Sequence, residues 1–470
     1  MRGTARRFRF SSMIKPFNLL IFLVITLAGA YSHASGAEWT GSLGTAWEEP
    51  ENWVDNILPT SADTVIIPVV STANYPVLGS FTFVGSLSVE TGASMTIANG
   101  GSFQASNVQI GGLLTLSPGG TLEIINDSGL LTIDAGGTLV LDGGNLIPNV
   151  IGIENSGTIE WTQGDITLQS GAELTNTSEG VIRISGSDPL MKLIDDESFG
   201  CSFKNQGRLI KDNAGEVIIA PSEIDHSGSM NINSGTLIFG LDISSSMFAS
   251  YSGSFQIAQD AAVRLFEGSH YFSSSMNGTA PTVDGSGDFI IGSSTQFDTI
   301  DINPYVFLEV DLVVNAPLIL NLAILEGPGN LVVNGNFLWR GGDLIGDVEA
   351  QGTPYPSVMV NSAGLIVSDL FKKLYFRNML INGEIAFSNG EFHLGGGSEF
   401  RVASGGSVRL VDITAADPTP EMKVLAYDEE PGNQFVNEGA IRGIGTLSFM
   451  AGSTYPAPRF VNNGVAGPGA

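Results

Sequence analysis

A short repeated motif constrains the fold of this 470-residue chain more than any other feature of its sequence. The motif consists of an apolar residue, Asn two positions later, Gly after two more, and then another apolar residue. Its copies are centred on Asn155, Asn205, Asn437 and Asn462, with looser copies at Asn176 and Asp225. Neighbouring copies place their glycines 21 to 27 residues apart. A period of this length, filled with short strands, is typical of one coil of a parallel β-solenoid.

Two further signatures recur between short runs of alternating apolar and polar residues. A Gly-Thr-Leu triplet begins at Gly120, Gly137, Gly235 and Gly445. The other signature is an aromatic residue, two further residues, Gly, an acid and an apolar residue, and it occupies 161–166, 339–344 and 387–392. Glycine allows the positive φ angles that corners need, and Asn tolerates the same conformation. We expect alternate apolar residues, such as Leu139 and Leu237, to face the core while Ser, Thr and Asn point outward.

The composition supports an all-β chain. The 60 glycines disfavour helix interiors, and 43% hydrophobic residues with only 14% charged residues are unlike a disordered chain. A series of antiparallel sandwiches is the alternative architecture. It predicts proline-rich linkers about every 100 residues, and the sequence has no such punctuation.

Residues 1–37 have the order of a secretory signal peptide. Five basic residues and no acid accompany an apolar run over 19–30, and small residues follow. Cleavage is expected after Ala34 or Ala37, with an uncleaved anchor as the alternative. A second apolar stretch, 306–325, is interrupted by polar residues including Glu309 and Asp311, so we predict buried strands there and no membrane-spanning segment in the mature chain.

The charge and the cysteine content exclude one class of partner and one kind of cross-link. The net charge is −28, and removal of the five basic residues in 1–37 makes it more negative, so nucleic acid is not an expected partner. Cys201 is the only cysteine, which excludes an internal disulfide and predicts a packed thiol.

Residues 38–68 differ from the rest of the chain because they hold three of its five tryptophans, Trp39, Trp47 and Trp53. We predict an N-terminal cap that covers the first coil of the solenoid. A platform of exposed indoles that stack on sugars is the alternative.

This segment resembles the N-terminal region of large bacterial surface and secreted β-helix proteins, of the kind common in Bacteroidetes, and the later repeats resemble those of autotransporter-type adhesins. The residues that carry the first resemblance are Trp39, Gly41, Trp47, Asn52, Trp53, Pro59, Asp63, Val65, Ile67, Pro68, Tyr75, Pro76 and the stretch 92–103. The resemblance implies a right-handed parallel β-helix with an N-terminal cap, displayed outside the cell, with adhesive or structural roles commoner than catalysis. Such proteins often end in a C-terminal anchoring or sorting domain; this sequence departs from that pattern, and we expect that domain to be missing from it.

The expected organisation is a signal peptide over 1–37, a Trp-rich cap over 38–68 and a parallel β-helix over 69–416. A loop-like insertion over 417–434 and further coils over 435–470, apparently truncated, follow.

Signals for catalysis are few, and we predict no catalytic, cofactor-binding or metal-binding residues. The histidines of the mature chain, His226, His270 and His393, are expected at the surface or in corners, and the basic cluster Lys372, Lys373 and Arg377 on a solvated face. A polysaccharide hydrolase or lyase would need paired carboxylates, for which the candidates are Asp195, Asp196 and Glu197, or Asp298 and Asp301.

Calcium is the one cofactor that an exported acidic chain favours. Asp284, Ser286 and Asp288 have ligand-like spacing but lack the glycine and glutamate of a helix-loop-helix site. Together, the repeats, the predicted signal peptide and the resemblance to bacterial surface proteins lead us to expect a structural or adhesive β-solenoid, secreted or on the bacterial cell surface, with a surface glycan or protein as its ligand. A carbohydrate-binding or polysaccharide-degrading β-helix protein is the alternative.

Overall fold

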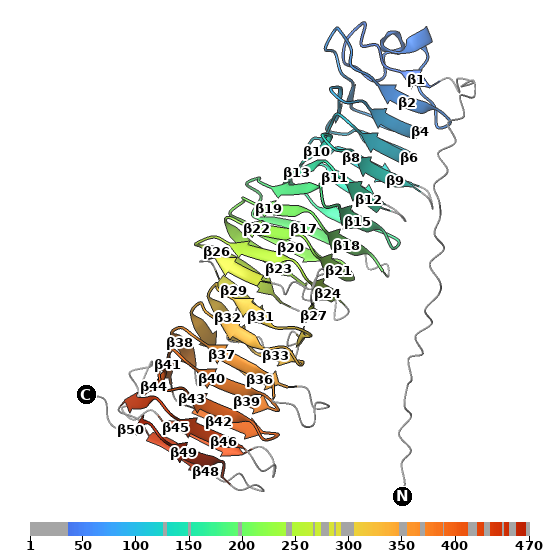
Figure 1. Cartoon of the computed structure of the whole chain (residues 1–470). Helices are drawn as coiled ribbons and strands as arrows, with labels where there is room; N and C mark the ends of the chain where they lie inside the picture. The colour runs from blue at the N-terminus through green and yellow to red at the C-terminus, as the bar shows by residue number, and fades with distance from the viewer. Residues whose placement is uncertain are drawn as a thin grey trace, which may run out of the picture. The chain divides into compact units, whose positions relative to one another are not determined.

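A computed structural model describes residues 36–125, 129–148, 152–195, 200–240, 247–266, 268–273, 282–285, 288–292, 305–346, 355–366, 372–388, 390–411, 421–426, 433–443, 446–450 and 457–466. Most of the predicted signal peptide lies outside these residues. The described chain forms stacked turns of short strands (Figure 1). From β7 to β48 the strands repeat in threes, which gives about 14 turns. The prediction of an all-β parallel β-solenoid is confirmed.

The strands form three parallel ladders, one on each face of the turn. Ladder 1 contains β3 (Val77–Leu78), β5 (Ser94–Ile97), β7 (Leu113–Leu116), β10 (Thr138–Asp142), β13 (Thr158–Gln163), β16 (Val181–Ile184), β19 (Arg208–Lys211), β22 (Ser229–Ile232), β25 (Ser254–Ile257), β28 (Thr282–Gly285), β31 (Leu312–Val314), β34 (Leu331–Val333), β37 (Ser357–Val360), β40 (Asn378–Ile381), β43 (Glu399–Val402), β46 (Gln434–Asn437) and β49 (Arg459–Asn462). Ladder 2 contains β8 (Thr121–Ile124), β11 (Asn145–Pro148), β14 (Ile166–Leu168), β17 (Leu190–Asp195), β20 (Glu216–Ala220), β23 (Gly235–Phe239), β26 (Ala261–Leu265), β29 (Asp288–Gly292), β32 (Leu318–Asn321), β35 (Phe337–Trp339), β38 (Gly364–Ile366), β41 (Glu384–Phe387), β44 (Ser407–Leu410), β47 (Ala440–Gly443) and β50 (Val465–Ala466). Ladder 3 contains β9 (Leu130–Ile133), β12 (Gly152–Asn155), β15 (Glu173–Asn176), β18 (Ser202–Asn205), β21 (Glu223–His226), β24 (Phe248–Tyr251), β27 (Ser269–Phe272), β30 (Tyr305–Leu308), β33 (Ala323–Glu326), β36 (Gly342–Ile345), β39 (Lys372–Tyr375), β42 (Gly390–Gly395), β45 (Glu421–Ala426) and β48 (Thr446–Met450).

The first turns differ from the later ones. The long strands β4 (Phe81–Val89) and β6 (Ser102–Ile110) each run across two faces, and β6 pairs with β8 through its first half and with β9 through its second. Before them lie β1 (Ala37–Glu38), two 3₁₀ helices at Pro50–Asn52 and Val54–Asn56, and β2 (Thr64–Ile67), which pairs with both β1 and β4.

The core fills the inside of the stack with alternate apolar side chains. Leu139 and Leu237 are fully buried, as predicted. The apolar stretch over 306–325 falls on β30 to β33, and its buried residues include Val306, Leu312 and Leu320, so the prediction of buried strands is confirmed. The described residues include no helix with the length and apolar character needed to span a bilayer.

The glycines of the Asn-x-Gly motif have a different role from the predicted one. A Cβ atom on Gly207 would lie 2.2 Å from the carbonyl oxygen of Thr177, and one on Gly228 would lie 2.1 Å from that of Gly207. Neither residue has a positive φ angle; positive values occur instead at glycines such as Gly119 and Gly136. The motif glycine is therefore required because the backbone of the preceding turn passes too close for a side chain.

The asparagines of the motif do not point outward as predicted. Asn155, Asn176 and Asn205 are buried in successive turns of ladder 3. The Asn155 amide donates to Asn176 Oδ1 (2.8 Å), and the Asn176 amide donates to Asn205 Oδ1 (2.7 Å). This row, the buried amide row, satisfies polar groups within the core through turn-to-turn hydrogen bonds.

Strand pairings occur in two segments that were predicted to lie outside the β-helix, the cap and the insertion. Parallel pairing begins between β1, which spans the predicted boundary between signal peptide and cap at 37/38, and β2, which lies inside the predicted cap. The predicted insertion 417–434 contains β45, which pairs with β42 and β48, so that part is a strand of the stack and not a loop. Residues 417–420 and 427–432 lie outside the described residues, and the other boundaries remain predictions.

Candidate functional site

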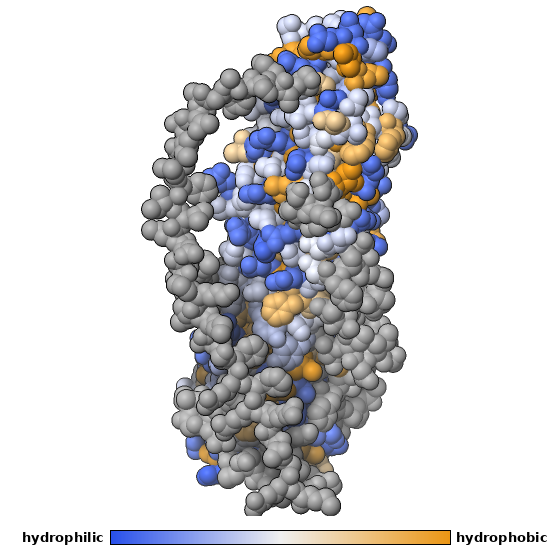
Figure 2. Space-filling view, turned by 90° about the vertical axis from the view of Figure 1, so that its right-hand side faces the viewer, coloured by the Kyte–Doolittle hydropathy of each residue, from blue (hydrophilic) through white to orange (hydrophobic). Residues whose placement is uncertain are grey.

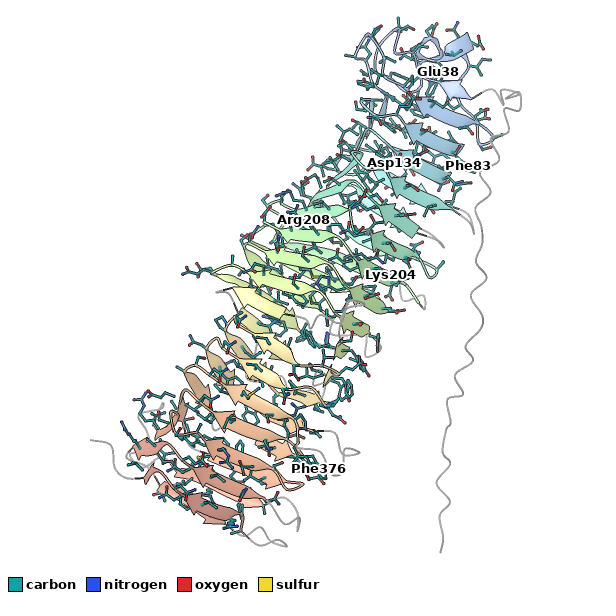
Figure 3. The ribbon with its side chains drawn as sticks, in the orientation of Figure 1. Glu38, Phe83, Asp134, Lys204, Arg208 and Phe376 are labelled. Carbon is teal, nitrogen blue, oxygen red and sulfur yellow. The ribbon has the colours of Figure 1, made fainter. Side chains whose placement is uncertain are left out.

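The outer face of ladder 3 carries the most distinctive set of outward side chains. Figure 1 shows the ladder 3 strands on the right, and Lys204 lies on this side in Figure 3. Because strands alternate inward and outward residues, each contributes up to two outward positions, which form two rows along the stack. Row A follows Glu173, Ser202, Glu223, Phe248, Ser269, Tyr305, Ile324, Asp343, Lys373 and His393. Row B follows Thr175, Lys204, Asp225, Ser250, Tyr271, Phe307 and, one turn on, Glu326.

Four aromatic side chains meet in the middle of this face and form what we call the aromatic patch: Phe248, Tyr271, Tyr305 and Phe307. The Tyr271 ring lies 4.6 Å from the Phe248 ring, 5.6 Å from Phe307 and 6.3 Å from Tyr305, measured between ring centroids. The Phe248 side chain is 42% exposed, and the other three residues are half-buried. None of the four belongs to the hydrophobic core inside the turns.

A hydrogen bond connects the patch to a carboxylate on the next turn. Tyr305 Oη donates to Glu326 Oε2 at 3.0 Å. Burial and the neighbouring carboxylate raise the pKa of the Tyr305 hydroxyl, so the group remains a neutral donor. Figure 2 shows the side of the molecule on which ladder 3 lies; where grey atoms do not cover it, hydrophilic and hydrophobic residues are interspersed.

A second group, the titratable cluster, follows on β36, β39 and β42. Asp343, Lys373 and His393 occupy row A on these successive turns, and Glu391 lies beside His393, with 3.5 Å between Glu391 Oε2 and His393 Nε2. Burial raises the pKa of Asp343 although Lys373 and His393 oppose the shift, and burial lowers the pKa of His393 although Glu391 opposes it. His393 is half-buried, with 13% of its side chain exposed, rather than at the open surface.

The structure corrects the prediction for the basic cluster. Lys372 and Arg377 are fully buried, and only Lys373 reaches the outer face, with its ammonium 4.6 Å from the centroid of Tyr375. The Arg377 guanidinium donates to the carbonyl oxygens of Ile345 (3.1 Å), Gly329 (2.9 Å) and Gly327 (2.6 Å). Burial lowers its pKa to about 10. Arg377 therefore joins neighbouring turns and does not bind an external anion.

The other two histidines are also buried, contrary to a surface position. His226 continues the buried amide row: its Nδ1 lies 3.1 Å from the Asn205 amide nitrogen, and its Nε2 lies 3.3 Å from the Ser254 carbonyl oxygen. Burial lowers the pKa of His226 to about 4. His270 Nδ1 lies 3.0 Å from the hydroxyl of buried Tyr251. Both imidazoles are structural.

Only one of the carboxylates considered from the sequence can be placed. Asp195 accepts a hydrogen bond of 2.6 Å from Ser222 Oγ. Asp196, Glu197, Asp298, Asp301 and Ser286 lie outside the described residues, as do the side chains of Asp284 and Asp288. Where the structure does describe side chains, no three His, Cys, Asp or Glu residues are grouped as metal ligands would be. The calcium hypothesis remains untested.

The tryptophans of the predicted cap form a buried cluster. Trp39, Trp47 and Trp53 are at most 3% exposed, and the Trp53 ring lies 5.0 Å from Trp39 and 4.7 Å from Trp47, between centroids. Trp47 also contacts Phe103 of β6 at 5.7 Å. The indoles therefore pack against the first turns and do not form an exposed platform. Cys201 is buried, as predicted for a packed thiol.

The chain was compared with protein-family models, curated proteins and solved structures. The model of a domain of unknown function, DUF8693, matches residues 38–140, which include the tryptophan cluster and the turns as far as β10. A search of curated proteins finds no match. Among solved structures, the chain is similar to a TibC-catalysed hyper-glycosylated TibA fragment, at 12% identity and a TM-score of 0.18, covering 83% of this chain and 93% of the fragment.

The sequence did not reveal the aromatic patch or the titratable cluster. Members on neighbouring turns are 18 to 36 residues apart in the chain, and they come together only through the register between turns. The sequence signal for both groups is a set of aromatic or charged residues at outward positions of neighbouring strands. Recognising it requires the register, that is, which residues pair between turns.

Proposed function

We propose that this chain is an extracellular adhesive β-solenoid, on the bacterial cell surface or secreted, which contacts its ligand through the outer face of ladder 3. The aromatic patch is the observation that supports this. Its four rings lie outside the core, and Phe248 is 42% exposed. Clustered outward aromatic residues are characteristic of binding surfaces.

The location rests on the order of residues in the N-terminal segment, which has the charge and apolar pattern of a secretory signal. The stack itself suits display, because its stability depends on burial and backbone pairing and needs no disulfide.

A polysaccharide-active enzyme is the second candidate, and the titratable cluster favours it. In this cluster burial raises the pKa of Asp343 and lowers that of His393, and such perturbed groups gather at catalytic sites. The aromatic patch would then hold the polymer on the preceding turns.

Protease treatment of intact source cells tests the location: the chain should be degraded by protease added outside, or be recovered from the medium. Adhesion of the purified chain to cell-surface preparations tests the binding role. A Phe248→Ala/Tyr271→Ala double variant should lose adhesion, while Phe81→Ala/Phe83→Ala, which removes two outward rings from β4, should retain it. An intracellular chain, or equal adhesion of both variants, would contradict the proposal.

An assay for new reducing ends separates the second candidate. Release of sugar ends by the wild-type chain and its loss in Asp343→Asn would favour the enzyme. Adhesion without release would leave the binding function as the better description.

A further inference from the structure

We infer that the aromatic patch binds an uncharged glycan, with the sugar chain lying along the axis of the stack. This inference rests on the proposed adhesive function and specifies the ligand of the same face. It is argued from the arrangement of the rings, the polar groups between them and the charges around them.

Rings and hydroxyls alternate on the three turns of the patch. On β24, row A carries Phe248 and row B carries Ser250; on β27, row A carries Ser269 and row B carries Tyr271. On β30 both rows carry rings, those of Tyr305 and Phe307. Each turn therefore contributes at least one ring, and adjacent strands lie about 4.8 Å apart. A surface that repeats in this way along one axis fits a polymer of ring-shaped units better than it fits an isolated small molecule.

The chemistry of the patch matches a sugar ring. One side of many pyranose rings is lined with C–H groups, which pack on aromatic rings, while the rim carries hydroxyls that both donate and accept hydrogen bonds. The patch offers aromatic surface together with the hydroxyls of Ser250, Ser269 and Tyr271, which also donate and accept. Beyond Tyr305, the Glu326 carboxylate is a further acceptor.

The surrounding charges select against an anionic ligand. Glu223 and Asp225 precede the patch on rows A and B, and Glu326 follows it. The whole chain has a net charge of −28. Uronic acid polymers and sulfated glycans would be repelled. A protein partner that inserts an apolar anchor would favour a continuous apolar surface, which Ser250 and Ser269 interrupt.

The test is binding of the purified chain to an array of immobilised uncharged and anionic glycans. We expect binding to at least one uncharged glycan, roughly tenfold weaker for Phe248→Ala and for Tyr271→Ala, since each removes a stacking surface. Tyr271→Phe, which keeps the ring, should bind within a few fold of the wild type. Phe83→Ala, which removes an outward ring on β4, is the matched control and should bind as the wild type does. Thermal unfolding of each variant verifies that the stack is intact.

Three results would overturn the inference: binding to no uncharged glycan on the array, binding to anionic glycans alone, or equal affinity of the folded Phe248→Ala and Phe83→Ala variants. Periodate treatment of a cell-surface preparation, which cleaves vicinal diols, distinguishes this failure from failure of the adhesive function. If adhesion survives periodate and is lost after protease treatment of the surface, the chain is an adhesin for a protein and the glycan inference is wrong.

Discussion

At the scale of single residues, His226 is the member of the buried amide row that can change its charge. Its folded-state pKa is lowered from 6.5 to about 4 by burial. Below about pH 6.5 the unfolded chain binds a proton that the folded chain does not bind until about pH 4. The free energy of unfolding should therefore fall as the pH decreases through this window, by about 3 kcal/mol from this residue.

His226→Asn should remove that dependence, because an amide can accept the bond from Asn205 and does not titrate. The measurement is urea unfolding of both proteins at pH 7 and pH 4. The change in unfolding free energy between the two pH values is then compared between the proteins, so that the contribution of the acidic residues, which both share, cancels. His393→Asn is the matched control and should change the pH profile less, since His393 is only half-buried. Parallel profiles for wild type and His226→Asn would contradict the prediction.

Gly228 provides a second prediction at this scale. A Cβ atom there would lie 2.1 Å from the Gly207 carbonyl oxygen, so Gly228→Ala must displace the backbone of one turn. We expect a loss of about 1–3 kcal/mol in unfolding free energy. Gly79→Ala, where a Cβ atom would meet nothing within 4 Å, should be within about 1 kcal/mol of the wild type. Chemical denaturation of the two variants compares them directly, and equal stabilities would show that the turn adapts.

The sequence identified these positions but not their reasons. The repeat predicted that Gly228 and Asn205 are corner residues; Gly228 lies in a corner, and Asn205 is the last residue of β18, directly before one. The predicted reasons, a positive φ angle for the glycine and an outward amide for the asparagine, were wrong. Both residues are determined by contacts with the neighbouring turns, and the distance between turns cannot be read from the sequence around either residue.

At the scale of strands and corners, Arg377 links β39 to the two preceding turns. Its guanidinium satisfies the carbonyl groups of Gly327, Gly329 and Ile345. Arg377→Met should leave these buried acceptors without a donor and cost about 3 kcal/mol in stability. Arg409→Met, at an exposed ion pair with Glu384, should cost less than about 1 kcal/mol. Thermal unfolding measures both, and equal midpoints would show that water replaces the guanidinium.

The strands were more predictable than such corner contacts. Alternation placed Leu139 and Leu237 inside correctly, since an inward position needs only a strand and a core. Lys372, Lys373 and Arg377 formed one basic run, so the sequence suggested a single solvated face. The structure divides them because strand alternation turns Lys372 inward and Lys373 outward, while Arg377 lies beyond the end of β39.

At the scale of the whole molecule, each turn contacts mainly its two neighbours, so complete turns should be removable. Deletion of residues 207–227 removes one turn and joins Gln206 to Gly228. β22 then takes the place of β19 next to β16, and Met230 takes the core position of Leu209 beside Ile182. This variant should keep the β-sheet circular dichroism of the wild type and unfold cooperatively. Deletion of 207–217 removes half a turn, shifts every later strand to another face, and should abolish the cooperative transition. Loss of structure in both deletions would contradict independent turns.

The period of the motif sufficed to predict this architecture, because few folds repeat every 21 to 27 residues with such short strands. The functional face could not be derived in the same way. Turn lengths vary, so the residues that become neighbours on ladder 3 cannot be aligned by counting, and Tyr271 next to Phe307 is visible only once β27 and β30 are paired.

The long strands β4 and β6 have a consequence for the order of assembly. They pair over eight residue positions, four on each side of Gly85, and neither strand ends between the two faces. Slippage by one residue there would turn every inward side chain toward solvent, which makes this pair harder to misalign than any four-residue pair after it. β4 and β6 are synthesised before the three-stranded turns. Their register would therefore form first during synthesis, and each later turn would pair with strands whose register is already fixed.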